Sequence, residues 1–113
     1  MKKGVGVVVV YNAEANVTNC EPGVKRKVLA YNEDVMMCEV SFEEGAVGNR
    51  HSHEHLQTTY VAEGSFEFYV AGEYATVKKG DSLLIPGGSE HGVKALEKGV
   101  LIDVFNPYRK EFL

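Results

Sequence analysis

Short strand-like segments dominate this chain of 113 residues, and signals for helices are almost absent. The segments are rich in Val, Tyr, Phe and Thr, and Gly, Pro and Asn residues separate them. The predicted strands are Val5 to Tyr11, Lys25 to Tyr31, Val35 to Phe42, Thr58 to Ala62, Ser65 to Val70, Tyr74 to Val77, Ser82 to Ile85, Gly92 to Ala95 and Val100 to Phe105. So many strands in so short a chain can bury a core only as a compact sandwich or barrel. We therefore predict one all-β domain over residues 1–113, ending in a helical turn packed by Phe112 and Leu113.

The charge balance and the cysteines exclude several classes of protein. Twelve basic and 16 acidic side chains give a net charge of -4, which disfavours nucleic acid and anionic membranes as partners. Cys20 and Cys38 lack the spacing of a zinc or redox pair, so we expect both to be reduced. The apolar run Gly4 to Val10 is too short for a membrane span, and it is better explained as a strand. We expect a cytoplasmic protein.

Histidines cluster in the segment from His51 to Gln57, which has the sequence His-Ser-His-Glu-His-Leu-Gln. In an extended chain, residues two apart project to the same side, so His51 and His53 can bind a single ion. His55 and Gln57 have the same parity, but four side chains in one row span too far for one coordination sphere. We therefore predict a turn near Glu54 to Leu56 that leaves His55 outside the set of ligands.

A second segment, from Gly80 to His91, predicts a turn, a buried strand and a Pro-Gly turn that delivers a third imidazole. Together the two segments resemble the paired motifs of the cupin superfamily. The residues that match these motifs are Gly45, His51, His53, Gln57 and Gly64 in the first and Gly80, Pro86, Gly88 and His91 in the second. The resemblance implies a double-stranded β-helix, or jelly-roll, barrel that holds one metal ion. Imidazole and amide ligands suit a divalent transition ion, whether Ni, Zn, Fe, Mn or Cu.

Gln57 stands where most cupins have glutamate. Three neutral imidazoles and a neutral amide leave the double charge of the ion uncompensated, which strengthens it as a Lewis acid and attracts an anionic ligand. A substrate that carries a carboxylate fits such a site. The alternative is that Gln57 only forms hydrogen bonds inside the barrel, while His51, His53, His91 and water hold the ion.

Asp103 places a carboxylate in the middle of the apolar strand Val100 to Phe105. If Asp103 shares the inner face with Leu101 and Phe105, then an acid and an aromatic ring face the metal; with the opposite parity, Asp103 lies on the surface. Parity alone leaves both arrangements open. Arg109 follows shortly, and an arginine can bind a carboxylate through two parallel hydrogen bonds.

The ending Asp103-Val104-Phe105-x-Pro107-x-Arg109-x-x-Phe112-Leu113, together with the histidine motif, resembles the pectin-degradation cupins of the KdgF type. This resemblance implies an enzyme that converts 4,5-unsaturated uronate monosaccharides from pectin or alginate into linear 5-keto-4-deoxyuronate. It implies His51, His53, Gln57 and His91 as metal ligands, Asp103 and Arg109 as catalytic residues, and Phe105 and Arg109 as substrate-binding residues. Glu54 departs from the family pattern, in which we expect proline.

The sequence leaves two other functions open. A metal-binding cupin of this size can be a dioxygenase, or it can be a non-catalytic domain that binds a sugar acid. The valine-rich N-terminal strand leaves an exposed edge unless it is covered, so we expect strand exchange in a homodimer, as in other cupins.

Overall fold

The computed structural model describes residues 2–3 and 6–113, and twelve strands account for most of them. The strands are β1 (Lys2–Lys3), β2 (Val8–Val9), β3 (Val17–Asn19), β4 (Val24–Tyr31), β5 (Met36–Phe42), β6 (Val47–His51), β7 (Leu56–Glu63), β8 (Ser65–Val70), β9 (Glu73–Lys78), β10 (Ser82–Ile85), β11 (His91–Ala95) and β12 (Gly99–Asn106). Two short 3₁₀ helices complete the chain, η1 (Asn12–Glu14) and η2 (Lys110–Phe112).

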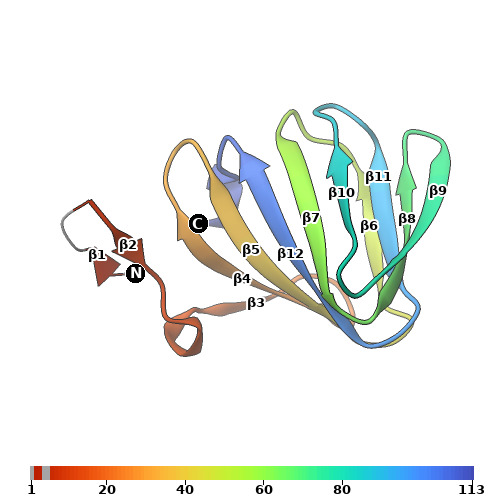
Figure 1. The fold of residues 1–113 in the computed structure, drawn as a ribbon, viewed down its shortest axis with the longest axis horizontal. Coiled ribbons are helices and arrows are strands. Elements are labelled where there is room, and N and C mark those ends of the chain that lie inside the picture. The colour runs from red at the N-terminus through yellow and green to blue at the C-terminus, as the bar shows by residue number, and fades with distance from the viewer. Residues whose placement is uncertain (1, 4–5) are drawn as a thin grey trace.

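Two antiparallel sheets face each other and form the barrel (Figure 1). The six-stranded sheet has the order β10-β7-β12-β5-β4-β3, and the four-stranded sheet has the order β6-β11-β8-β9. Strands that are neighbours in a sheet are often far apart in the sequence, as with β12 between β5 and β7. The arrangement is the predicted cupin jelly roll.

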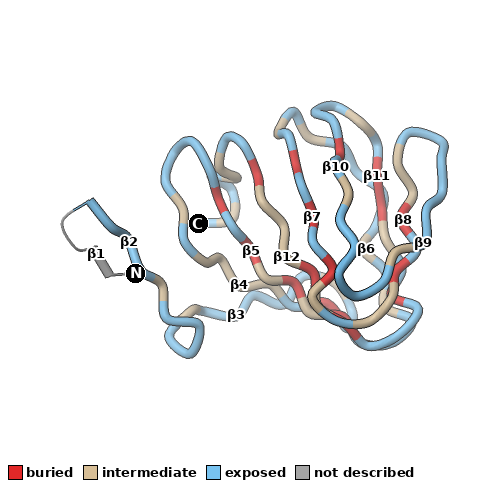
Figure 2. Tube along the Cα trace, viewed as in Figure 1, coloured by how far each residue is buried: buried red, intermediate tan, exposed pale blue. Residues whose placement is uncertain are grey.

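The core lies between the sheets, because alternate residues of the strands project inward (Figure 2). In β5 the buried positions are Met36, Cys38, Val40 and Phe42, which alternate with more exposed residues. In β7 the same period buries Gln57 and Thr59 beside Val61. Two polar side chains of one strand therefore enter the barrel, and they need polar partners there.

Eight of the nine predicted strands occur with boundaries shifted by two residues or fewer, and Ser65–Val70 and Ser82–Ile85 match fully. The prediction missed β1, β3 and β6. Of these, β3 and β6 are short and largely exposed. At the C-terminus η2 confirms the helical turn, and Phe112 packs against the core. The expected packing of Leu113 is wrong, because this residue is 61% exposed.

The N-terminal segment extends away from the barrel and forms its own two-stranded sheet of β1 and β2 (Figure 1). The predicted strand Val5 to Tyr11 shrinks to Val8–Val9, and Val5 lies outside the described residues. Valine side chains at positions 7–9 are exposed. No helix in the described part of the chain is long and apolar enough to cross a membrane.

Both cysteines are free, as predicted. Cys38 is buried in the core, and burial raises the pKa of its thiol to about 12, so it stays protonated at neutral pH. Cys20 is exposed in the turn between β3 and β4.

A close backbone approach joins the two histidine-bearing segments. A Cβ atom at Gly87 would collide with the carbonyl oxygen of Glu54, so only glycine fits there. Beside it, the backbone N–H of Gly88 donates to the carbonyl of His53 at 2.7 Å. The Pro-Gly turn before His91 is thereby held against the loop that carries His53.

Candidate metal centre and active site

Three histidines meet at one end of the barrel. His51 ends β6 and His91 begins β11, and the two residues are paired across these strands. His53 lies in the loop that follows β6. One ring nitrogen from each of His51, His53 and His91 lies within 4.8 Å of the other two, which is a spacing that one ion can bridge. These are the three histidines that the sequence predicted.

Backbone carbonyls fix the orientation of all three rings. Each Nδ1–H donates to a carbonyl two residues away in the sequence, which leaves Nε2 with a free lone pair. The pairs are His51 with Asn49 at 2.9 Å, His53 with His55 at 3.1 Å, and His91 with Ser89 at 2.9 Å. A metal-binding imidazole requires this tautomer.

Two of the three histidines, His53 and His91, are also held in their neutral form. Burial lowers the pKa of His53 to about 4, and the positive charges of Arg109 and His91 lower it further. Burial likewise lowers the pKa of His91, although its hydrogen bond to the Ser89 carbonyl opposes the shift. Neutral imidazoles at physiological pH offer lone pairs rather than protons to an ion.

Gln57 is buried on β7 and faces the histidines. Its Oε1 lies 3.1 Å from Nε2 of His53, and its Nε2 donates to Oγ1 of Thr59 at 3.0 Å. Neutral His53 carries one proton, yet an oxygen atom lies against each of its ring nitrogens. With the proton on Nδ1, two lone pairs face each other between His53 and Gln57, and a cation there would satisfy both. The donor set therefore fits a metal ion.

Asp103 faces the interior of the barrel. Leu101 and Phe105, which share its parity on β12, are 2% and 3% exposed, so the inward alternative is correct. The hydroxyl of Thr59 donates to Oδ1 of Asp103 at 2.7 Å. Burial raises the pKa of Asp103 to about 6, although hydrogen bonds from Thr59 and Gln57 and the charge of Arg109 act against this shift.

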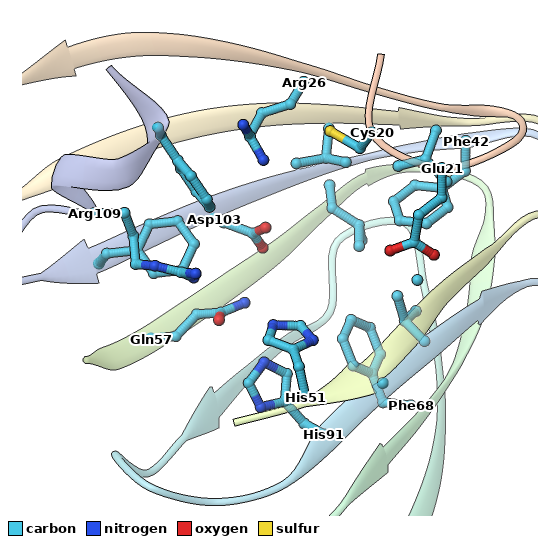
Figure 3. A pocket seen from close by; sticks show the side chains of 18 residues that line it. Cys20, Glu21, Arg26, Phe42, His51, Gln57, Phe68, His91, Asp103 and Arg109 are labelled. Atoms are coloured by element: carbon cyan, nitrogen blue, oxygen red, sulfur yellow. The ribbon is translucent and has the colours of Figure 1, made fainter. Parts of the chain in front are cut away.

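His51, Gln57, His91 and Asp103 line one cavity of about 290 Å³ (Figure 3). We call the side of His51, His53, His91 and Gln57 its histidine end, and the side of Arg26, Asp103, Arg109 and Phe112 its arginine end. In Figure 3 the labelled Arg26, Asp103 and Arg109 point toward the space in front of His51, His91 and Gln57. The cavity therefore combines lone-pair donors, two guanidinium groups and the carboxyl groups of Asp103 and Glu21.

Arg109 and Phe105 lie together at the arginine end. The guanidinium of Arg109 lies 5.2 Å from the ring centre of Phe105 and 4.3 Å from that of Phe112. Its Nε donates to Oε1 of Glu111 at 2.9 Å, and its side chain is 12% exposed. Both residues that the KdgF resemblance implied as substrate-binding groups thus line the cavity.

His55 lies outside the three-histidine cluster, as the sequence predicted. Its Nε2–H donates to the carbonyl of Tyr108 at 3.1 Å. The ring therefore ties the histidine-bearing loop to the C-terminal segment that carries Arg109.

The sequence prediction missed two residues of the site: Arg26, which lines the cavity, and Thr59, whose hydroxyl lies between Gln57 and Asp103. A weak signal existed for each. Thr59 follows Gln57 by two residues on one strand, so the two share a face. Arg26 lies between Val24 and Val28 with inward parity on β4, where an apolar residue is ordinary.

Comparisons with known proteins agree with this geometry. The family model described as a cupin domain matches residues 38–105. The pectin degradation protein KdgF of Dickeya dadantii (strain 3937) is 46% identical over 93 residues, which cover 80% of this chain and 84% of that protein. The structure of KdgF from Halomonas sp. superposes with a TM-score of 0.88 at 39% identity, covering 96% of this chain and 100% of the other. An RmlC-like cupin from Shewanella frigidimarina NCIMB 400 gives a TM-score of 0.89 at 33% identity, over 93% and 95% of the two chains.

Proposed function

The chain belongs to the cupin family and, within it, is a relative of the KdgF proteins, and from this premise we propose that it linearises 4,5-unsaturated uronates. The substrate is a monosaccharide released from pectin or alginate, and the product is 5-keto-4-deoxyuronate. A continuous set of contacts carries the proposal. It runs from His53 through Gln57 and Thr59 to the carboxyl group of Asp103. A metal centre and a proton-transferring group thus share one cavity.

We propose that His51, His53, Gln57 and His91 hold one divalent transition ion. Imidazole nitrogen and amide oxygen suit such an ion, and the opposed lone pairs of His53 and Gln57 favour a cation between them. When bound, the ion supplies Lewis-acid chemistry by polarising a substrate oxygen. All four protein ligands are neutral, so the ion would keep its full double charge and act as a strong Lewis acid.

Asp103 moves the proton that the reaction requires. Ring opening begins with loss of a proton from the C1 hydroxyl, and the electron pair of the broken C1–O5 bond stays on O5. The resulting C5 enolate becomes a ketone when C4 gains a proton. A single carboxyl group can accept the first proton and return it to carbon, and transfers of this kind contribute about 10²- to 10⁴-fold to a rate.

Phe105 and Arg109 position the substrate. The ring of Phe105 is buried beside the cavity and offers an apolar surface to one face of the sugar. Arg109 presents guanidinium N–H groups toward the substrate carboxylate. These contacts hold the C1 hydroxyl and C4 near Asp103 and so lower the entropic cost of the reaction.

The test uses freshly generated 4,5-unsaturated galacturonate and the metal-replete protein. The loss of ultraviolet absorbance by the enol is followed against a sample without enzyme and against a His51→Ala, His53→Ala variant. We expect acceleration with the wild-type protein alone. A wild-type trace equal to the spontaneous one would contradict the proposal. Oxygen uptake measured in parallel would then identify a dioxygenase, and unchanged bound ligand would identify a sugar-acid-binding protein.

We further propose a cytoplasmic homodimer in which residues 1–113 form a single domain. The outer face of the six-stranded sheet exposes apolar side chains, with Met37 40%, Tyr60 49% and Leu84 58% exposed. The projecting N-terminal segment adds exposed valines. Covering both surfaces with a second copy would bury this apolar area.

A further inference from the structure

Arg26 is the second arginine of the cavity, and none of the roles proposed above uses it. It lies on β4, half-buried, and lines the cavity together with Asp103 and Arg109 (Figure 3). Its strand is far in sequence from the metal motif and from the C-terminal segment. The fold therefore brings a positive charge to the arginine end that no local motif encodes.

The guanidinium of Arg26 is oriented but lacks a polar partner. It stacks on the ring of Phe112, with its central carbon 3.6 Å from the ring centre. Its Nε is buried and has no hydrogen-bond partner in the described structure. A buried charged donor without an acceptor is costly, so an acceptor from a bound molecule would be strongly favourable there.

Arg109 differs from Arg26 in this respect. Its Nε already donates to Glu111, and this is the one ion pair among the described residues. The carboxylate of Glu111 neutralises part of the charge that Arg109 presents to the cavity. Arg26 has no such carboxylate within ion-pair distance among residues 6–113. The two arginines therefore offer unequal positive charge to a ligand.

We propose that Arg26 binds the substrate carboxylate and makes the site select the free acid over its uncharged ester. This inference rests on the proposed function. Arg26 supplies the unpaired charge and Nε–H donor, Phe112 fixes the plane of the guanidinium, and Arg109 contributes the second set of donors. The carboxylate end of the sugar then lies at the arginine end of the cavity. A methyl ester keeps the carbonyl oxygen but loses the negative charge that Arg26 recognises.

The test compares the 4,5-unsaturated acid with its methyl ester in wild type, Arg26→Met and Arg26→Lys. Methionine keeps an unbranched stem that packs on Phe112, and lysine keeps the charge. We expect Arg26→Met to lower kcat/KM for the acid about ten- to one-hundredfold, mainly by raising KM. The kcat/KM for the ester should change only a few-fold. Arg26→Lys should retain part of the preference for the acid. Equal losses for acid and ester, or no loss, would overturn the assignment.

Arg50→Met is the matched control. Arg50 also stacks on an aromatic ring, with its central carbon 3.6 Å from the ring centre of Tyr69, but it does not line the cavity. Its replacement should leave kcat/KM unchanged for both the acid and the ester. Far-ultraviolet circular dichroism and the melting temperature check the fold of each variant. If Arg26→Met does not fold, the test rests on Arg26→Lys and on its ratio of kcat/KM for the acid to kcat/KM for the ester. A ratio equal to that of wild type would contradict the proposal.

A binding measurement separates this inference from the proposed function. Saturated galacturonate cannot open to the enol product, and its binding is followed by the ¹⁵N-detected Nε–H signal of Arg26 in metal-replete protein. A shift in this signal supports the assignment even if the wild-type protein fails to accelerate ring opening. No shift at saturating galacturonate, together with unchanged kinetics of Arg26→Met, rejects Arg26 while leaving the proposed function intact.

Discussion

The two ends of the cavity are built in different ways. At the histidine end, each imidazole is oriented by a carbonyl only two residues away. At the arginine end, contacts join distant parts of the chain, such as Thr59 and Asp103, which are 44 residues apart. Arg26 and Phe112 come from almost opposite ends of the sequence. Local geometry therefore orients the three imidazoles, whereas the register of the sheets positions the acid and the arginines.

Removing a histidine should have the largest effect, because it removes one proposed metal ligand from the histidine end and leaves the arginine end in place. We expect His91→Ala to lose bound metal and to reduce activity to the spontaneous rate. The other two imidazoles and Gln57 cannot hold the ion with the same affinity. Metal content by mass spectrometry and the enol assay measure the two effects. Retention of a full equivalent of metal would show that His91 is not a ligand.

Asp103→Asn should affect the arginine end alone. Asparagine has nearly the same shape but cannot accept and return the proton, so we expect activity to fall about 10²- to 10⁴-fold with metal content unchanged. Asp34→Asn is the control, since Asp34 is an exposed acid in the loop before β5. Turnover equal to wild type would rule out the proposed role of Asp103.

The pKa of Asp103 predicts that the stabilities of the metal-free wild-type protein and of metal-free Asp103→Asn depend differently on pH. Burial raises this pKa from 3.8 to about 6, so protonation favours the folded state. The stability contribution is present below pH 4 and is lost as the pH rises through 6, by on the order of 3 kcal/mol. The lowered pKa of His53 acts in the opposite direction in both proteins. Urea unfolding from pH 4 to pH 7 should therefore show Asp103→Asn gaining stability relative to wild type as the pH rises. Parallel curves of unfolding free energy against pH for the two proteins would contradict this prediction.

Thr59→Val should give the smallest effect, because it cuts the contact between the two ends and leaves both in place. Valine keeps the shape of threonine but removes the hydroxyl between Gln57 and Asp103. The loss of about one hydrogen bond to a charged group predicts a fall in kcat of roughly tenfold with metal retained. Thr59→Ser should restore most of the activity. If serine and valine give the same loss, the hydroxyl has no role beyond packing.

Much of the fold could be predicted because its strands alternate cleanly. Ser65–Val70 was correct to the residue, since apolar positions two apart mark a buried face. Ser82–Ile85 was also correct to the residue, because turns flank this short apolar run on both sides. The strands β3 and β6 escaped prediction because neither has a buried face that produces such a pattern. The side of β12 on which Asp103 lies could not be decided either. Between Val100 and Phe105, both sets of alternate residues are apolar apart from Asp103, so the pattern fits either face.

The sequence by itself determined that His51 and His53 lie close together, because their spacing brings two imidazoles together wherever the chain is extended. Pairing of β6 with β11 then adds His91. Only the tertiary structure decided the arginine end. Arg26, Thr59 and Asp103 belong to β4, β7 and β12. The order and register of these strands bring Arg26 and Asp103 to one cavity and place Thr59 within hydrogen-bond distance of Asp103. A one-residue shift in register would turn such a side chain to the opposite face, so pairing between distant strands, rather than any local motif, places these groups.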